Sequence, residues 1–180
     1  IFSFVFMMVA SVFVYYFSTD SHVKVLSCKN NYYLSDNEVY DLANVSTKTR
    51  LYFVPSILFE KRVEKMPFVQ SCKLSKKNRK LTFDVQEKLI VGYYVKGDKN
   101  FALFQDGTSI EIEEQYLNMI VHFPLLSDFN AKQRKQLCEQ FQKHSKVLTR
   151  DLIEKFAEIV PYKTSYDKNM FKITMQDGNI

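Results

Sequence analysis

The sequence predicts an α+β protein that begins with a transmembrane helix and continues into two folded units. Residues 1–17 form an apolar run without a single charged side chain. Residues 22–88 then alternate between strand-like and helix-like patterns, and residues 89–180 contain several short alternating segments. The 180 residues are 46% hydrophobic and carry a net charge of +5, so there is enough apolar material for the core of one domain or two small ones.

Residues 1–17 are predicted to be the transmembrane helix. As a helix they would reach roughly 26 Å, just short of the hydrocarbon core of about 30 Å, and we expect residues upstream of Ile1 to complete the span. Tyr15, Tyr16 and Phe17 suit the membrane interface. The alternatives are a cleaved signal peptide and a buried core helix. However, no A-x-A-like site follows the run, and bulky apolar residues surround the whole circumference.

The anchor is expected to hold the rest of the chain outside the cytoplasm, as a single-pass type II membrane protein. Within the dozen residues after the apolar run, the only basic side chains are Lys24 and Lys29. Cytoplasmic flanks of membrane spans carry an excess of Lys and Arg. The exit side of this run therefore fits the outer face of the membrane.

The first folded unit is expected over residues 22–88, in the order strand–helix–helix–strand–strand. Alternating valines predict a short strand over residues 22–28. Ser35 and Glu38 form a capping box, in which the two side chains satisfy backbone N–H groups at the start of a helix. A second helix is predicted from Pro55, because proline suits the first helical position.

Two strands joined by a polar turn are expected to complete this unit. Pro67 ends the second helix, and Phe68–Leu74 then forms a strand. Arg79–Glu87 is the clearest strand in the chain, with apolar side chains at every second position from Leu81 to Val85. Two helices on one face of a three-stranded sheet would bury a single core.

The second unit is expected over residues 89–180, as a β-rich domain that also contains helices. Asp106 and Gly107 mark a hairpin turn, and Pro161 is expected to end the last helix. The chain stops at Ile180 directly after an Asp-Gly turn, which favours a domain whose C-terminal part is missing. The predicted elements are strands over residues 89–95, 101–104, 110–113 and 170–175, an irregular link over 123–129, and helices over 130–143 and 149–160.

Composition excludes several classes of protein. The four glycines lie too far apart for the phosphate-binding loop of a nucleotide fold. The positive charge is small and scattered, which argues against nucleic acid as a partner. Cys28, Cys72 and Cys138 are an odd number, so they cannot form a complete disulfide framework, and they lack the spacing of a zinc site.

The sequence contains no pattern that indicates catalysis or a cofactor. His22, His122 and His144 are isolated from one another, so no metal site is predicted. Cys138 and His144 would lie on different faces of a helix, and Cys138 is interpreted as a core residue. The motifs of serine acyl transfer are absent from the sequence, and the carboxylates near Glu111 are interpreted as a solvated surface. We therefore expect a protein that is not an enzyme and that binds no cofactor or small-molecule substrate.

Several segments follow the apolar run in a fixed order: VKVLSCKNNYYLSDNEV, EKRVEKMPFVQSCKLSKKNRKLTFDVQEKLIVGYY, ALFQDGTSI, FPLL and AEIVPYKTSYDKNMFKITMQDGN. Together they resemble the bacterial cell-division family FtsQ/DivIB, and the resemblance covers nearly the whole chain. It is most specific from Pro67 through the hairpin to Lys88. The terminal DGN is similar to the DivIB form of the family.

The resemblance implies a POTRA domain over residues 22–88, with its third strand between the first and the second, followed by the β domain of the family. It also implies a non-enzymatic divisome scaffold that supports septum assembly and septal peptidoglycan synthesis. The implied partners are FtsL-like and FtsB/DivIC-like membrane proteins. The implied location is the bacterial cell membrane at the division septum.

The sequence departs from the family pattern at three places. Lys29 stands where the family has a turn glycine after the first strand, and lysine tolerates a positive φ poorly. Asn78-Arg79-Lys80 replaces the usual proline of the hairpin. The β domain of the family also continues beyond Ile180, through the strands implied to bind the partners.

Two strands are expected to offer open edges to a partner. In the implied sheet order, residues 68–74 form an edge strand with unpaired backbone N–H and C=O groups, and residues 170–176 form a second edge. Such edges accept an extended segment of a partner by strand addition. The candidate partner-binding residues are Phe68, Val69, Gln70, Ser71, Cys72, Lys73, Leu74, Met170, Phe171, Lys172, Ile173, Thr174, Met175 and Gln176.

Cys28 and Cys72 are expected to remain reduced. In the implied sheet their strands are two spacings apart, roughly 9–10 Å. A disulfide requires Cα atoms about 4.4–6.8 Å apart. Both thiols are therefore predicted to lie at or near the core.

The hairpin of the first unit carries a basic run. It consists of Lys73, Lys76, Lys77, Arg79 and Lys80. We interpret it as a solvated turn that discourages edge-to-edge aggregation. Attraction to anionic wall polymers or lipid headgroups is the alternative. Two other functions stay open: a POTRA-bearing component of secretion or outer-membrane assembly, and an envelope enzyme or wall-polymer-binding protein.

Overall fold

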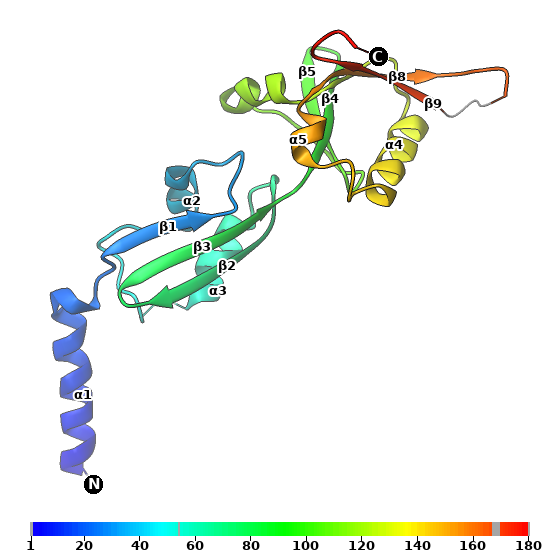
Figure 1. Cartoon of the computed structure of the whole chain (residues 1–180). Coiled ribbons are helices and arrows are strands. Elements are labelled where there is room, and N and C mark those ends of the chain that lie inside the picture. The colour runs from blue at the N-terminus through cyan, green and yellow to red at the C-terminus, as the bar shows by residue number, and fades with distance from the viewer. Residues whose placement is uncertain (1, 54, 167–169, 180) are drawn as a thin grey trace. The chain divides into compact units, whose positions relative to one another are not determined.

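The computed structural model describes residues 2–53, 55–166 and 170–179 (Figure 1). Residue 1, the first residue of the predicted anchor, and residue 180, the last residue of the predicted second domain, lie outside the described residues. The chain forms two compact units, residues 1–87 and 88–180. Each unit has its own sheet, of three strands in the first and six in the second.

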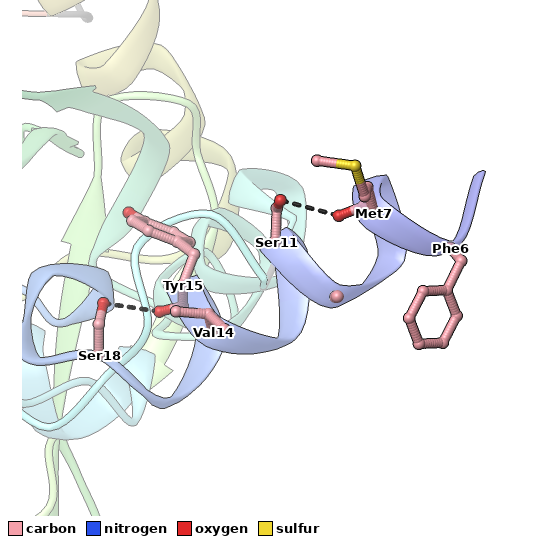
Figure 2. Close-up of a pocket in the computed structure, with 7 residues that line it drawn as sticks. Phe6, Met7, Ser11, Val14, Tyr15 and Ser18 are labelled. Carbon is pink, nitrogen blue, oxygen red and sulfur yellow. Dashed lines mark hydrogen bonds between the residues drawn. The ribbon is translucent and has the colours of Figure 1, made fainter. Parts of the chain in front are cut away.

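The first unit begins with the helix α1, Phe2–Phe17, in which no residue is buried. The hydroxyl of Ser11 donates a hydrogen bond to the carbonyl of Met7 at 2.8 Å, and that of Ser18 donates to the carbonyl of Tyr15 at 2.8 Å, as Figure 2 shows. Ser11 therefore satisfies its hydroxyl group within the helix, and Ser18 bonds the last turn of the helix from just beyond its end. Within the residues that the structure describes, no helix has both the length and the apolar character needed to cross a membrane.

The first unit continues in the predicted order of strand, two helices and two strands (Figure 1). The helix α2 starts with the predicted capping box, because Ser35 accepts from the N–H of Glu38 and Glu38 accepts from that of Ser35. Pro55 stands one residue before α3, at its N-cap. The bounds are β1 Val25–Lys29, α2 Asp36–Ala43, α3 Ser56–Val63, β2 Val69–Lys77 and β3 Lys80–Glu87, after a short 3-10 turn η1 at Thr19–Ser21.

The three strands lie in the order β1-β3-β2, with β1 parallel and β2 antiparallel to β3. Every second side chain of β3 from Leu81 to Val85 is fully buried, whereas Asp84 and Gln86 are exposed. The helices add Phe59 and other apolar side chains to the same core. One face of the sheet is thus covered, as the alternation predicts.

At both turns that depart from the family pattern, residues other than glycine adopt a positive φ. Asn30, next to Lys29, takes the positive φ of 60° after the first strand. In the hairpin between β2 and β3, Asn78 and Arg79 have φ values of 49° and 62°, which is the backbone of a two-residue type I′ turn. Asparagine tolerates the left-handed region better than other non-glycine residues.

The second unit is built on a six-stranded sheet in the order β6-β5-β4-β7-β8-β9. Gly92 of β4 lies so close to β7 that an added Cβ would meet the carbonyl oxygen of Pro124 at 2.7 Å. The core gathers Val91 and Leu103 from the sheet with Leu137 and Phe141 from a helix. The bounds are β4 Ile90–Lys96, β5 Lys99–Phe104, β6 Ser109–Glu111, η2 Glu114–His122, β7 Leu125–Leu126, α4 Ala131–Lys143, α5 Arg150–Ile153, β8 Phe156–Tyr162 and β9 Met170–Met175.

Two predictions for the second unit are wrong. The helix predicted over residues 149–160 is only one turn, α5, and the chain then becomes the strand β8. Phe156 and Ile159 are three residues apart, which is a helical spacing. Both are buried in β8 because the register shifts between Phe156 and Glu158, and pairing with β7 and β9 decides for the strand. The link predicted to be irregular over residues 123–129 contains β7, which joins β4 to β8 in the middle of the sheet.

Candidate partner-binding strand edges

The strand β9 is the last strand of the six-stranded sheet and pairs only with β8 among the described strands. On β8, the carbonyl of Ile159 accepts the N–H of Ser127, 3.2 Å away, on the β7 side. Because backbone groups alternate along a strand, those of Glu158 and Val160 face β9. The ladder between β8 and β9 is therefore built on these alternate residues.

This register determines which backbone N–H and C=O groups of β9 do not bond to β8. Val160 lies opposite Lys172, and Glu158 lies opposite Thr174. Lys172 and Thr174 therefore direct their N–H and C=O groups to β8, whereas Phe171 and Ile173 direct theirs to the open side. No backbone or side-chain partner for these outward groups is found among the described residues.

The side chains of β9 divide in the same alternating way. Phe171, Ile173 and Met175 pack against the core of the second unit, and Phe171 stacks on Phe129 with ring centroids 5.7 Å apart. All three are only partly buried. A further strand beside β9 would therefore cover apolar surface as well as backbone groups.

The C-terminal end of the β9 edge is closed by the chain itself. The N–H of Met175 bonds the carbonyl of Asn179 at 2.8 Å, and its carbonyl accepts from Gly178 at 3.0 Å. Gly178 has a φ of 85°, which allows this tight turn. Of the candidate residues 170–176, Phe171 and Ile173 thus carry the open part of the edge.

The second candidate edge, β2, differs from the prediction. It is an edge strand, but the carboxylate of Glu64 accepts the N–H of Cys72 at 3.0 Å, and that of Glu60 accepts the N–H of Leu74 at 2.8 Å. Both glutamates lie on α3 or just after it, four residues apart, so their side chains share one face of the helix. The prediction that residues 68–74 present unpaired N–H groups is therefore wrong at these two positions.

The remaining candidate residues of β2 are divided between core and solvent. Phe68, Val69 and Cys72 are buried in the first unit, whereas Gln70 and Lys73 are exposed. Sequence reasoning missed the two glutamates that occupy this edge. Their spacing of four residues just before the edge strand was the available signal.

The basic hairpin is tied to the segment after α1. Arg79 pairs with Asp20 at 2.7 Å and donates to the carbonyls of Thr19 at 2.5 Å and His22 at 3.2 Å. Its side chain is therefore held in place, which corrects the interpretation of the whole run as solvated. Burial lowers the pKa of Lys76, partly offset by the nearby Glu60.

Cys28 and Cys72 are free thiols, as predicted, and Cys138 is a free thiol buried in the core of the second unit. Burial raises the pKa of Cys28 and of Cys138 to about 11 and that of Cys72 to about 12. Because the thiolate is the reactive form, these thiols are poor nucleophiles near neutral pH. No group of three or more potential metal ligands occurs among the residues that the structure describes.

Comparisons with known proteins point in one direction. DivIB of Bacillus cytotoxicus is 23% identical to the chain over 166 residues, which cover 92% of the chain and 63% of that protein. DivIB of Listeria monocytogenes is 20% identical over 182 residues, which cover 97% of the chain and 64% of that protein. The chain is therefore similar to cell-division proteins named DivIB over most of its length. It spans somewhat less than two thirds of the length of these curated relatives.

Two further comparisons add little to this similarity. The extracytoplasmic domain of DivIB from Geobacillus stearothermophilus aligns with a TM-score of 0.35 and 17% identity, over 52% of the chain and 75% of that domain. An overlap at this TM-score is too loose to bear on the fold. No family model matches the chain.

Proposed function

We propose that this protein is a non-enzymatic scaffold of bacterial cell division. The observation that carries the proposal is the similarity to DivIB, which extends over 92% of the chain. In this role it binds FtsL-like and FtsB/DivIC-like membrane proteins outside the cytoplasm. It supports assembly of the septum and septal peptidoglycan synthesis, and it concentrates at the division septum.

The scaffold is anchored in the cell membrane by α1, as a single-pass type II protein. This part of the proposal is supported by the character of the helix, which is apolar on every side and has no buried residue. A helix of this kind is better accommodated in lipid than in water. The first unit then corresponds to a POTRA domain, a correspondence supported by its element order and by the central position of β3.

The partner binds by strand addition at β9. The outward backbone groups of Phe171 and Ile173 supply hydrogen bonds, and the partly buried side chains between Phe171 and Met175 supply apolar surface. Strand addition at β2 is a weaker alternative, because a partner strand would have to displace Glu60 and Glu64 from the N–H groups they accept. The favoured contact is therefore the β9 edge.

Capture of division proteins by the full-length protein tests this mechanism. Ile173→Pro removes an outward N–H and adds bulk at the open edge, while leaving the groups that pair with β8 untouched. Ile173→Ala loses similar packing but keeps the N–H, so it is the matched control. We expect capture of FtsL-like and FtsB/DivIC-like proteins to fall about tenfold for Ile173→Pro relative to Ile173→Ala.

Two outcomes would contradict the proposal in different ways. Equal capture by the two variants would exclude strand addition at β9. Failure of the unsubstituted protein to capture any division protein would count against the scaffold itself. Circular dichroism of both variants shows that the second unit remains folded.

A further inference from the structure

Apolar and basic side chains are exposed together at the end of the first unit that contacts α1. We call this set the α1-proximal rim. We propose that the α1-proximal rim rests in the headgroup region of a phospholipid membrane that contains anionic lipids, an inference that rests on α1 being the proposed membrane anchor. The rim consists of Tyr52, Phe53, Ile57, Leu58, Lys77 and Lys80.

The apolar part of the rim is held against the last turns of α1. Phe53 meets the ring of Tyr16 edge-on at 4.8 Å and stacks with Tyr15 at 6.2 Å. Arg50 lies 4.0 Å above the ring of Tyr16 and donates to its carbonyl at 3.0 Å. The loop that carries Tyr52 and Phe53 is therefore fixed beside the point where the apolar run ends.

The basic part of the rim is fixed to the same place by the hairpin. Arg79 bonds the side chain of Asp20 and the carbonyls of Thr19 and His22, which directly follow α1. Lys77 and Lys80 flank this turn and are exposed. Two segments far apart in the sequence thus come together at one end of the first unit (Figure 1).

The exposure of the apolar side chains is unusual for a folded unit. Tyr52 is 62% exposed, Ile57 54%, Leu58 48% and Phe53 40%. Apart from α1 itself, the described part of the first unit exposes only two other large apolar side chains, Val25 and Tyr32. Ile57 and Leu58 lie in the first turn of α3, where the next residue, Phe59, has its ring 5.9 Å from Lys76 Nζ in the strand that enters the hairpin. Apolar side chains exposed at one end of a folded unit mark an interaction surface.

The chemistry of the patch fits a lipid interface. Aromatic rings gather at the headgroup level of membranes, and lysines there bind anionic headgroups. The chain has no acidic residue between Asp41 and Glu60, whereas Lys48 and Arg50 lie in this stretch. Asp20, the carboxylate directly after α1, is paired with Arg79 at 2.7 Å, which offsets its repulsion of anionic lipids.

The surface of α1 is continuous with the rim through an apolar groove. This groove has a volume of about 270 Å³ and lies between Phe53 and the helix. Its lining is completed by Val12, Phe13, Tyr16 and Phe17. A lipid acyl chain fits such a lining, so lipid around α1 would reach the rim without a break. This continuity favours lipid over a protein partner as the occupant.

Fluorescence quenching in vesicles tests the inference. The sequence contains no tryptophan, so Phe53→Trp introduces a single tryptophan, which can be excited selectively over the tyrosines. The full chain is reconstituted into vesicles of phosphatidylcholine and phosphatidylglycerol with bromine atoms near the headgroup end of the acyl chains. We expect the tryptophan of Phe53→Trp to lose about half of its emission, because interfacial side chains reach roughly 5–10 Å into this region.

Tyr32→Trp is the matched control. Tyr32 is exposed and precedes Tyr33, whose N–H bonds Glu87 at the far end of β3 from the hairpin turn. Its tryptophan should keep nearly all of its emission. Leu58→Trp provides a second rim position if Phe53→Trp perturbs the loop. Replacing Lys77 and Lys80 by glutamate should reduce quenching in the vesicles that contain phosphatidylglycerol.

Flotation of the same vesicles separates the possible failures. A chain that does not float with the vesicles overturns the membrane anchor and the rim together. A chain that floats but shows no quenching at either rim position overturns the rim alone. Blue-shifted but unquenched emission from the rim would mean that protein covers it, which also overturns the inference.

Discussion

At the scale of single residues, side chains that bond backbone groups across long sequence separations hold the first unit together. Glu87 is only 8% exposed and accepts the N–H groups of Tyr33 at 2.7 Å and Leu34 at 3.0 Å. These contacts join the end of β3 to the segment before α2. A buried N–H without an acceptor is costly, so the carboxylate stabilises this junction.

Replacing Glu87 tests this role. Glu87→Ala should lower the free energy of unfolding of the first unit by about 2–4 kcal/mol, because the buried N–H of Leu34 and the partly buried N–H of Tyr33 lose their acceptor. Gln86→Ala is the control, since its side chain is exposed and accepts only from Ser71. It should cost less than about 0.5 kcal/mol. Urea unfolding measures both; equal effects would contradict the assignment.

Several residue-scale features could be predicted from the sequence, and others could not. The capping box of Ser35 and Glu38 was predictable because both partners lie within one helical turn. The contact of Arg79 with Asp20 joins residues 59 positions apart, and the glutamates at the β2 edge depend on how α3 packs. Such pairings follow from the tertiary fold and have no local sequence signature.

At the scale of elements, the close approach of β4 and β7 depends on Gly92. A Cβ at this position would lie 2.7 Å from the carbonyl oxygen of Pro124 and 2.8 Å from a methyl group of Leu126. The backbone oxygen cannot move without shifting β7, which is only two residues long and bridges β4 to β8. The centre of the six-stranded sheet is therefore sensitive to this glycine.

Gly92→Ala should destabilise the second unit by about 2 kcal/mol through this overlap. Gly97→Asn is the control, because Gly97 has open space around it and asparagine tolerates its φ of 62°. We expect the control to change stability by less than about 0.5 kcal/mol. Thermal unfolding of the two variants measures both changes. Unchanged stability of Gly92→Ala would contradict the prediction, because it would show that β7 shifts to accommodate the added Cβ.

Elements with a clear period or cap were predicted well, and those that depend on partners were not. The helix α4 and the strand β9 follow their predicted ranges closely. The strand β8 was predicted as a helix because Phe156, Ile159 and Val160 also match a helical face. The strand β7 is too short to show a period, so only its two neighbours in the sheet define it.

At the scale of the whole molecule, the resemblance to FtsQ/DivIB was predictable because many weak segments occur in one order. No single segment decides the assignment, but relatives named DivIB match the chain over most of its length. The candidate edges were located correctly at β2 and β9, since strand order follows from the implied topology. The topology does not specify that Glu60 and Glu64, from α3 and the residue after it, accept N–H groups of the β2 edge.

The proposed function joins these three scales: an anchored platform is proposed to offer backbone edges to other proteins of the division machinery. The most direct test is the distribution of the full-length protein, fused to a fluorescent protein, in dividing cells of its own bacterium. The account predicts a ring at the division septum before constriction is complete. Uniform fluorescence around the cell membrane throughout the division cycle would contradict it.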